Sequence, residues 1–469
     1  GAAPLASGPL TATVTVNGVA SNPAQVANVV ATPVITASSA YLLAGTPTLR
    51  ITGTGFDPTD ANNSVALSSG AGEVTSASST ELVVRLTKTP TAGPLSAHVV
   101  VDGVVSQEAL VAMVFPDVTA STANLPATAT TLTITGIGFD PIASHNLIAL
   151  SSGSGVVTSA TATRLVVSLT PPQLGPLTAF VIVNGQSTPA QVANVVPGPA
   201  SAATSTLTVS AASFAAGGST QVTLQAKDAL GNNLSTGGLK VTFALAAGST
   251  AGRLSAVTDN RNGTYSATFT SSTMGSATFT ARLNGNNVRA TAKAAVVFQS
   301  NFPGSGALNA PWLVKAGRFT VASGTATAGP APNSVAIYNG TASQNLSASV
   351  TVSNVGTGDL AALVARYSAN TGYYRAGLLN VKGSLFAVIQ RVTISKSGQQ
   401  VVKTLSKQAV TLSGAAGIRF AVAGSSLRLF LNGTLVATAT DATFRGGSVG
   451  IGGSAGTTFA SFTAAAAGS

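Results

Sequence analysis

The stretch LRITGTGFDP at residues 49–58 returns as LTITGIGFDP at residues 132–141. Three further pairs of matching segments follow in the same order: ALSSG at 66–70 and 149–153, TELVVRLT at 80–87 and TRLVVSLT at 163–170, and GPLSAHVVVDG at 93–103 and GPLTAFVIVNG at 175–185. The offset is 83 positions for the first three pairs and 82 for the last, and such a nearly constant offset marks tandem copies of one structural unit. We therefore expect two equivalent modules, at residues 32–115 and 116–197.

Within each copy the apolar residues alternate with polar ones, which predicts β-strands. Leu49 and Ile51 alternate with Arg50 and Thr52, and a period of two places each set on one face of a strand. Turn residues recur about every 8–12 positions, as they do in β-sandwiches. The GTGFDP motif supplies glycines for a bend and an aromatic plug for the core, and no helix follows that would make it a nucleotide-binding loop.

The chain opens with a partial copy of the same unit. GPLTATVTVNG at 8–18 and PAQVANVV at 23–30 match the closing segments of the second copy. Residues 1–31 therefore hold only closing strands, and we expect the array of repeats to continue on the N-terminal side of Gly1. A lone hairpin cannot bury an apolar face, and open strand edges recruit other strands.

We expect this partial copy to be an assembly edge. Leu10, Val14 and Val16 share one strand face and need a partner sheet, which favours a head-to-tail contact with another copy of the chain. The next repeat and the preceding part of a longer molecule are the alternative partners.

The repeats of residues 1–197 resemble IPT/TIG immunoglobulin-like domains, on the ITGxGF core, the short strands and the closing VxVNG hairpin. Residues 198–296 contain DNRNGTYSATF at 259–269 and resemble the filamin-type and bacterial invasin-type immunoglobulin domains. That resemblance implies that Tyr265 packs in the core. It also implies that Asn262 and Gly263 form a tight turn, which agrees with hairpin chemistry.

Residues 297–469 resemble concanavalin-A-like, LamG-type jelly rolls, on FQSNFPGSGALNAPW at 298–312 and LRLFLNGTLVATATD at 427–441. Relatives often carry Asp where Ser300 stands, which weakens the calcium site that the family implies. We expect no cofactor, and the alternative is a weak calcium site at Asp359 or Asp441. Asp441 follows a strand and is also placed to cap a turn. The fold class is therefore all-β: tandem immunoglobulin-like β-sandwiches followed by a jelly-roll β-sandwich.

The composition excludes several kinds of site. The chain has no cysteine, so it has neither disulfides nor zinc sites built on thiolates. No run of eighteen or more apolar residues occurs, so we expect no transmembrane segment. Only 7% of residues are charged, and from residue 301 onward twelve Lys and Arg stand against two acidic residues. The C-terminal part is thus strongly basic.

The sequence offers no catalytic constellation. The two histidines, His98 and His145, fall in different repeats, whereas a triad needs its members within hydrogen-bond reach. The C-terminal domain has only Asp359 and Asp441 as acids, without a visible arrangement of the facing pair that glycoside hydrolysis uses. We therefore expect no enzymatic activity.

One group of candidate binding residues in the C-terminal domain is aromatic. Trp312, Tyr373 and Tyr374, with Arg375 adjacent, can offer a ring face to a sugar. Neighbouring residues of a strand point to opposite faces, so only one of the two tyrosines can be exposed. Trp312 and one tyrosine are alternatively core residues.

A second group is basic. A predicted hairpin around Ser397 and Gly398 carries Arg391, Lys403 and Lys407, which share strand parity and are expected to form one positive face. This face is either simply solvated, or contacts an anionic glycan, a lipid headgroup or a neighbouring subunit. Nucleic acid is not an expected partner, because the basic residues lack interleaved aromatics and a known binding module.

These features favour an extracellular or cell-surface bacterial protein without catalytic activity. We expect a stalk of immunoglobulin-like modules that presents a basic jelly-roll head to a glycan, a surface or another subunit. The alternatives are a self-assembling extracellular fibre and the accessory region of a secreted polysaccharide-degrading enzyme. Ordered filaments would favour the fibre, and a catalytic module outside this sequence would favour the enzyme.

Overall fold

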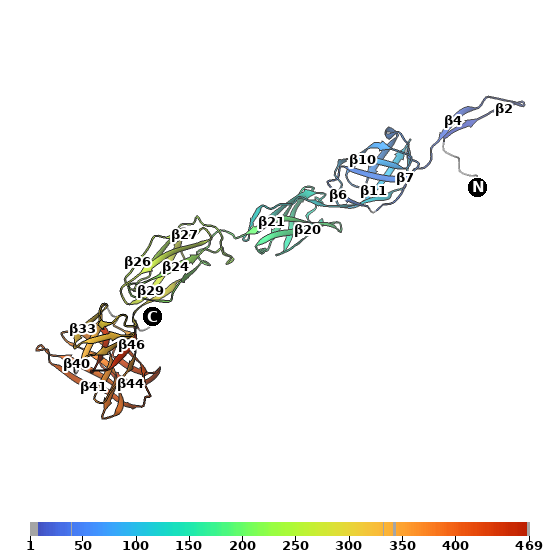
Figure 1. The fold of residues 1–469 in the computed structure, drawn as a ribbon. Helices are drawn as coiled ribbons and strands as arrows, with labels where there is room; N and C mark the ends of the chain where they lie inside the picture. The colour runs from blue at the N-terminus through green and yellow to red at the C-terminus, as the bar shows by residue number, and fades with distance from the viewer. Residues whose placement is uncertain (1–7, 39, 332, 341–343, 467–469) are drawn as a thin grey trace. The chain divides into compact units, whose positions relative to one another are not determined.

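The computed structural model describes residues 8–38, 40–331, 333–340 and 344–466. The chain divides into two compact units, Gly1–Pro199 and Ala200–Ser469. Strands dominate the described residues, where the helical elements are two single 3-10 turns, η1 (Asp60–Asn62) and η2 (Ala143–His145) (Figure 1). The predicted all-β class is therefore confirmed. No helix in this described part has the length and apolarity needed to cross a membrane.

The first complete repeat is a β-sandwich. One sheet has the strand order β5-β7-β10-β9; the other has the order β12-β11-β13-β6, with β8 also paired to β11. β6 runs parallel to β13, and the other pairs are antiparallel. The strands are β5 (Val34–Ile35), β6 (Tyr41–Leu43), β7 (Thr48–Thr54), β8 (Asn63–Leu67), β9 (Ala71–Ala77), β10 (Glu81–Lys88), β11 (Gly93–Val101), β12 (Val104–Val105) and β13 (Ala109–Phe115).

The second repeat has the same arrangement. Its sheets have the orders β14-β16-β19-β18 and β15-β21-β20-β17, and β15 runs parallel to β21 as β6 does to β13. The strands are β14 (Asp117–Val118), β15 (Asn124–Pro126), β16 (Thr131–Ile137), β17 (Asn146–Leu150), β18 (Gly155–Thr161), β19 (Arg164–Leu169), β20 (Gly175–Val183) and β21 (Gln186–Val196).

The GFDP motif makes the same bend in both repeats. Gly55 and Gly138 have φ angles of 76° and 84°, a conformation that glycine adopts without steric cost. Phe56 and Phe139 then turn into the core, where their exposed fractions are 4% and 1%. The motif is thus a strand bend with an aromatic plug, as the sequence predicted.

A buried asparagine closes the loop after each bend. Asn63 Nδ2 donates to the carbonyl oxygens of Asp57 and Thr59, both at 2.8 Å, and Asn63 Oδ1 accepts the Asp57 N–H at 3.1 Å. Asn146 makes the same three bonds to Asp140 and Ile142. The repeats therefore agree in side-chain contacts as well as in strand order.

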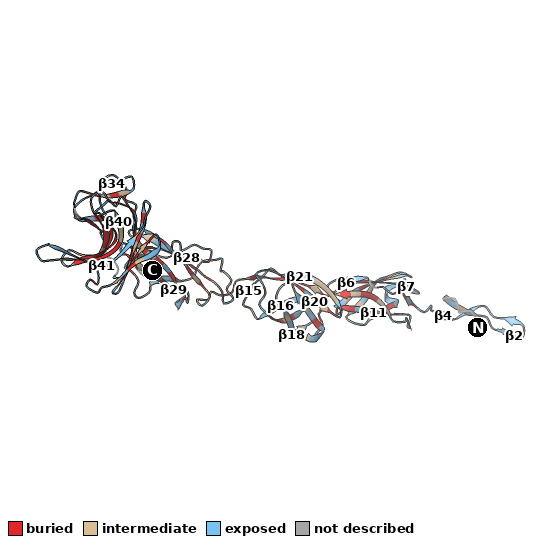
Figure 2. Cartoon of the chain, turned by 90° about the horizontal axis from the view of Figure 1, so that it is seen from below, coloured by how far each residue is buried: buried red, intermediate tan, exposed pale blue. Residues whose placement is uncertain are grey.

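Residues 8–29 form a hairpin with the same strand register as the β20–β21 hairpin that closes the second repeat. β1 (Gly8–Ala12) pairs with β4 (Ala24–Val29), and β2 (Thr15–Val16) pairs with β3 (Val19–Ala20). Leu10 lies opposite Ala27 and is followed by a β-bulge, as Leu177 lies opposite Ala193 before the bulge between β20 and β21. Most of this hairpin is exposed (Figure 2).

The third module is a sandwich of two more sheets. One sheet has the order β22-β24-β28-β26, and β27 also pairs with β28. In the other sheet β29 lies between β25 and β31, β23 pairs with β31, and β30 pairs with β29. The strands are β22 (Thr206–Val209), β23 (Ser213–Ala215), β24 (Ser219–Gln225), β25 (Val241–Leu245), β26 (Arg253–Leu254), β27 (Thr258–Asp259), β28 (Thr264–Thr270), β29 (Gly275–Leu283), β30 (Asn286–Asn287) and β31 (Ala292–Ser300).

Tyr265 and the turn before it lie as the resemblance implied. Tyr265 is 1% exposed, and its hydroxyl oxygen accepts the Leu239 N–H at 2.9 Å. Gly263 has a φ of 80°, and Asn262 Oδ1 accepts the Thr264 N–H at 3.1 Å.

The C-terminal domain, which we call the head, is a sandwich of two large sheets. One sheet contains the strands β46-β37-β42-β43-β44 in that order. On the other side of β46, β35 pairs with β46, β34 pairs with β35, and β32 pairs with β34. The last strand of the third module, β31, also pairs with β46. These strands are β32 (Gly306–Ala307), β34 (Phe319–Ala322), β35 (Thr325–Ala328), β37 (Leu346–Ser353), β42 (Ala416–Ala423), β43 (Ser426–Leu431), β44 (Thr434–Thr440) and β46 (Thr458–Ala466).

The other sheet of the head has seven strands in the order β33-β36-β45-β38-β39-β40-β41. Its inner face joins the main core, in which Tyr374 and Ile389 pack together with Phe420 of β42. Its outer face carries two smaller apolar clusters made only of residues of this sheet. The strands are β33 (Trp312–Ala316), β36 (Ser334–Tyr338), β38 (Leu360–Ser368), β39 (Gly372–Val381), β40 (Ser384–Ile394), β41 (Gln400–Val410) and β45 (Ser448–Gly453).

Candidate functional site

The predicted aromatic platform is buried, which corrects the sequence-based expectation. Trp312 is 4% exposed, and Tyr373 and Tyr374 are both 0% exposed. The two tyrosines do point to opposite faces of β39, but Tyr374 lies in the main core and Tyr373 in an outer cluster with Val392. None of the three rings can therefore lie against a sugar in this structure.

Trp312 is part of the core of the head. Its ring contacts Phe302, Tyr338 and Phe462 at centroid distances of 5.4, 5.5 and 4.8 Å. Its indole Nε1 donates to Ser300 Oγ at 3.1 Å, and both residues are buried. The Ser300 hydroxyl thus serves as the hydrogen-bond acceptor of the buried indole.

Arg375 lies on the outer face of the seven-stranded sheet within a polar network. Its Nε donates to Gln390 Oε1 at 2.7 Å and its Nη1 donates to Asn333 Oδ1 at 3.1 Å. Gln390 Nε2 in turn donates to Thr404 Oγ1 at 3.3 Å on the edge strand β41. Tyr373 lies two residues from Arg375 on the same face, and its buried hydroxyl has no hydrogen-bond partner among the described residues.

The network contains no negative charge. Arg375 is 8% exposed and forms no ion pair with a described residue. Burial lowers the pKa of Arg375, and the smaller electrostatic effect of Tyr373 raises it. Its third nitrogen, Nη2, makes no hydrogen bond to a described residue. A guanidinium with free donors is a binding group for planar anions.

The predicted basic patch does not form one face. Lys403 lies opposite Arg391, but Lys407 lies opposite Val388, because a β-bulge follows between Ile389 and Gln390. The bulge adds one residue to β41, and one extra residue reverses the face of every later side chain. Lys407 accordingly sits over the Phe386 ring, with Nζ 4.0 Å from its centroid, on the face opposite Arg391 and Lys403.

Arg391 is also not a free charge. Its Nη1 donates to Asp441 Oδ2 at 2.8 Å and to Thr443 Oγ1 at 2.7 Å. Asp441 Oδ1 accepts the Tyr374 hydroxyl at 2.6 Å and the Thr443 N–H at 2.9 Å. Asp441 therefore caps a turn, as the sequence indicated, and holds β39 and β40 to the segment that follows β44.

The environment keeps Asp441 ionised. Burial alone would raise its pKa, but hydrogen bonds from Thr443 and Tyr374 and the charge of Arg391 outweigh burial, so that the pKa of Asp441 is lowered. A carboxylate held in this way is a structural anion rather than a general acid, which would need a raised pKa.

Asp359 and Asp441 do not come together. The backbone of Asp359 pairs with Asn380, whereas Asp441 binds Tyr374, and these two partners are six residues apart on β39. That separation is about 20 Å of extended strand, whereas the carboxyl groups of glycosidases lie about 5–10 Å apart. The two acids therefore form neither a catalytic pair nor a shared metal site, and no cluster of metal-binding side chains occurs in the described residues.

The histidines have local partners. His145 Nδ1 lies 3.0 Å from Asp140 Oδ2, and His98 Nε2 lies 3.9 Å from Glu108 Oε2. Each pair is within one repeat and its histidine is about half exposed, so neither assembles with a nucleophile.

The predicted assembly edge is largely uncovered. Val14 and Val16 are 63% and 64% exposed, and Leu10 is half-buried. Their counterparts in the second repeat, Val181 and Val183, are fully buried. In the second repeat these positions share a core with Ile134 and Val167 of the opposing sheet, β14-β16-β19-β18, which has no counterpart in the described hairpin.

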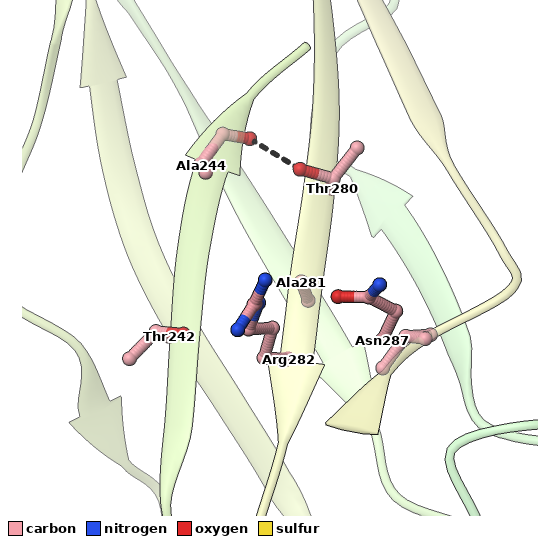
Figure 3. Close-up of a pocket in the computed structure, with 7 residues that line it drawn as sticks. Thr242, Ala244, Thr280, Ala281, Arg282 and Asn287 are labelled. Atoms are coloured by element: carbon pink, nitrogen blue, oxygen red, sulfur yellow. Dashed lines mark hydrogen bonds between the residues drawn. The ribbon is translucent and has the colours of Figure 1, made fainter. Parts of the chain in front are cut away.

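The third module has a hollow of about 480 Å³ beside β25 and β29 (Figure 3). The Thr280 hydroxyl donates to the Ala244 carbonyl at 3.2 Å, and Arg282 and Asn287 lie on the same part of the module (Figure 3). Arg282 is the one charged group of its lining, which contains no carboxylate or imidazole. The hollow therefore lacks the groups for acid–base chemistry.

Residues 201–301 match the family model described as invasin, domain 3. The match covers the third module and much less than half of the chain. No curated protein sequence matches the chain significantly.

Several solved structures align with parts of the chain. The Escherichia coli adhesin FdeC aligns at 19% identity over 81% of this chain and 97% of its own, with a TM-score of 0.28. Invasin, described as a bacterial integrin-binding protein, aligns at 17% identity over 80% and 79%, with a TM-score of 0.30. The carbohydrate-binding module CBM66 from Bacillus subtilis aligns at 14% identity over 33% and 96%, with a TM-score of 0.27. These scores are too low to support an inference about this chain.

Proposed function

We propose that the chain is part of a bacterial cell-surface adhesin in which tandem immunoglobulin-like modules carry a non-catalytic head that binds a glycan. The invasin domain 3 match of residues 201–301 supports the surface role. The repeats and the third module act as spacers, and the recognition function belongs to the head.

The observation that carries the proposal is the uncompensated charge of Arg375 on the outer face of the head. A buried cation without a counter-charge is unfavourable, yet Gln390 and Asn333 hold this one in a fixed orientation through neutral oxygens. Groups of this kind are concentrated at functional sites. A hydroxyl-rich or acidic polysaccharide lying across this face would complete the hydrogen bonds of Arg375.

The test is the binding of the whole chain to a panel of neutral and uronic-acid polysaccharides immobilised on a surface. The proposal predicts retention on at least one of them, with loss of retention in the Arg375→Gln variant. Arg428→Gln is the matched control, because Arg428 is an exposed arginine on β43 in the other sheet. Absence of binding to the whole panel, or equal binding by Arg375→Gln, would reject the glycan-binding head.

The same preparation tests the absence of catalysis. We expect no release of reducing ends from any polysaccharide of the panel, because the two acids of the head lie too far apart to act as a pair. Release that persists after purification and disappears in Asp441→Asn or Asp359→Asn would contradict this part of the proposal.

A second candidate function is a subunit of an extracellular fibre, and the exposed hairpin of residues 8–29 favours it. Its apolar side chains occupy positions that are core positions in the complete repeats. Strands of another copy that add to the hairpin would bury them. The fibre predicts concentration-dependent filaments by light scattering and electron microscopy, and their loss when residues 8–29 are deleted. Unchanged assembly after the deletion would exclude the hairpin as the contact.

A further inference from the structure

A pocket of about 230 Å³ lies at one end of the head. Its lining comes from the two residues before β37, from the irregular part of β38, from the β42–β43 turn and from the segment after β44. Its lining contains two arginines, Arg366 and Arg445, together with Asn345, Ser425 and the ring of Phe444. No acidic residue belongs to the lining, so the pocket is positively charged.

Arg366 forms the fixed part of the pocket. It is 2% exposed, and its Nε and Nη2 both donate to the Gln344 carbonyl, at 3.1 and 2.8 Å, while Nη1 donates to the Phe444 carbonyl at 2.6 Å. These three bonds use only part of the donors of a guanidinium. Its partners are neutral, and burial lowers the pKa of Arg366. The charge of Arg366 is therefore not compensated within the described chain.

Arg445 forms the open part. It is exposed, and it has no hydrogen bond or ion pair to a described residue. Asp441, four residues earlier, is bound to Arg391 and Tyr374, and Asp359 lies near the other end of β39. Neither acid of the head thus neutralises the pocket.

The size of the pocket limits what can enter. Sites that enclose a whole small-molecule ligand measure about 300–1,000 Å³, and this one is smaller. It has room for one charged group with the ring that carries it. Phe444 and Ala442 supply an apolar wall, and Asn345 and Ser425 supply polar contacts for hydroxyls.

We propose that this pocket binds the terminal acidic residue of a glycan, with the anionic group held between Arg366 and Arg445. The anionic group is a carboxylate or a sulfate ester, both of which accept the paired N–H donors of arginine. This role rests on the proposed glycan-binding function of the head. The pocket is separate from the outer face around Arg375, so it gives the head a way to recognise chain ends in addition to the chain itself.

The test measures binding of glucuronate, glucose 6-sulfate and glucose to the whole chain by ligand-observed NMR. Both acidic sugars are expected to bind and glucose is not; a preference between the two separates carboxylate from sulfate recognition. Arg445→Gln should weaken acidic-sugar binding by about tenfold or more, as loss of a charged hydrogen bond does. Arg282→Gln, which removes an exposed arginine of the third module, should leave binding unchanged.

Folding is checked separately from binding. Arg445 makes no contacts that the fold needs, so Arg445→Gln should keep the unfolding midpoint reported by the fluorescence of Trp312, the one tryptophan of the chain. Loss of polysaccharide retention in Arg375→Gln is measured separately, so the pocket and the proposed glycan face can each fail without the other. Equal binding of glucose, no binding of either acidic sugar, or full binding by a folded Arg445→Gln variant would each overturn the inference.

Discussion

Arg375 Nε donates a hydrogen bond of 2.7 Å to Gln390 Oε1 across two neighbouring strands of the head. The guanidinium is held in position by an amide where a structural arginine would usually have a carboxylate. An arginine without a counter-charge is expected in a binding site, whereas an arginine paired with a carboxylate stabilises the fold. The two roles predict opposite effects on protein stability when the arginine is mutated.

The Arg375→Gln variant should be at least as stable as the wild-type chain. Removing an uncompensated buried charge relieves a desolvation cost, and the shorter amide can still bond to Gln390, so the free energy of unfolding should be unchanged or rise by about 1 kcal/mol. Urea unfolding followed by Trp312 fluorescence measures this. A loss of more than about 2 kcal/mol would show that Arg375 is primarily structural.

Arg391 and Asp441 make the opposite prediction. Their side chains are 25% and 9% exposed and are joined at 2.8 Å. Asp441→Asn leaves Arg391 without its counter-charge and should reduce the stability of the head by about 1–3 kcal/mol. The same fluorescence measurement applies, and an unchanged unfolding curve would contradict the role assigned to this pair.

The stability of the head should fall in acid because of Asp441. Its pKa is lowered from the ordinary value of 3.8, so the stabilisation is fully present above that value and is lost as the pH falls through the lower, folded-state pKa. Unfolding curves taken from about pH 6 to about pH 2 should show this loss, and Asp441→Asn should show a smaller dependence on pH. Equal dependence in both proteins would assign the effect to other groups.

Ser300→Ala should destabilise the head by about 1–3 kcal/mol, because it leaves the buried indole N–H of Trp312 without a partner. Ser300→Thr retains a hydroxyl and tests whether the bond itself matters. The wavelength of the tryptophan emission gives a second readout, since it should change in the alanine variant even where the protein is folded. Identical stability and emission of wild type and Ser300→Ala would contradict the assignment.

The two repeats offer a matched pair of mutations. Asn63→Ala and Asn146→Ala each remove three hydrogen bonds at equivalent loops and should each cost about 2 kcal/mol of local stability. Hydrogen exchange at β8 in the first variant and at β17 in the second should rise by similar factors. A large effect in only one repeat would show that the two loops are not equivalent.

Local patterns predicted the repeats well. The GFDP bend depends on two glycines and one phenylalanine that are close in sequence, so its geometry could be read from the motif. The turn at Asn262 and the burial of Tyr265 were likewise set by a short segment. Strand alternation and turn spacing sufficed for the all-β class for the same reason.

Predictions that required the register between strands were less accurate. Lys403 and Lys407 share parity, but an extra residue in β41 places them on opposite faces, and no sequence signal marks that bulge. The burial of both Tyr373 and Tyr374 arises because the outer face of the sheet is also closely packed. Asn333, Gln390 and Thr404 were not predicted as neighbours of Arg375, since they come from separate segments that only the sheet brings together.

The most direct test of the account is the affinity of the whole chain for the polysaccharide that it retains best, measured by calorimetry for the wild type, Arg375→Gln and Arg428→Gln. If the outer face of the head is the binding surface, Arg375→Gln should bind at least about tenfold more weakly, and Arg428→Gln should bind as the wild type does. Equal affinities of the wild type and a folded Arg375→Gln variant would contradict the central claim.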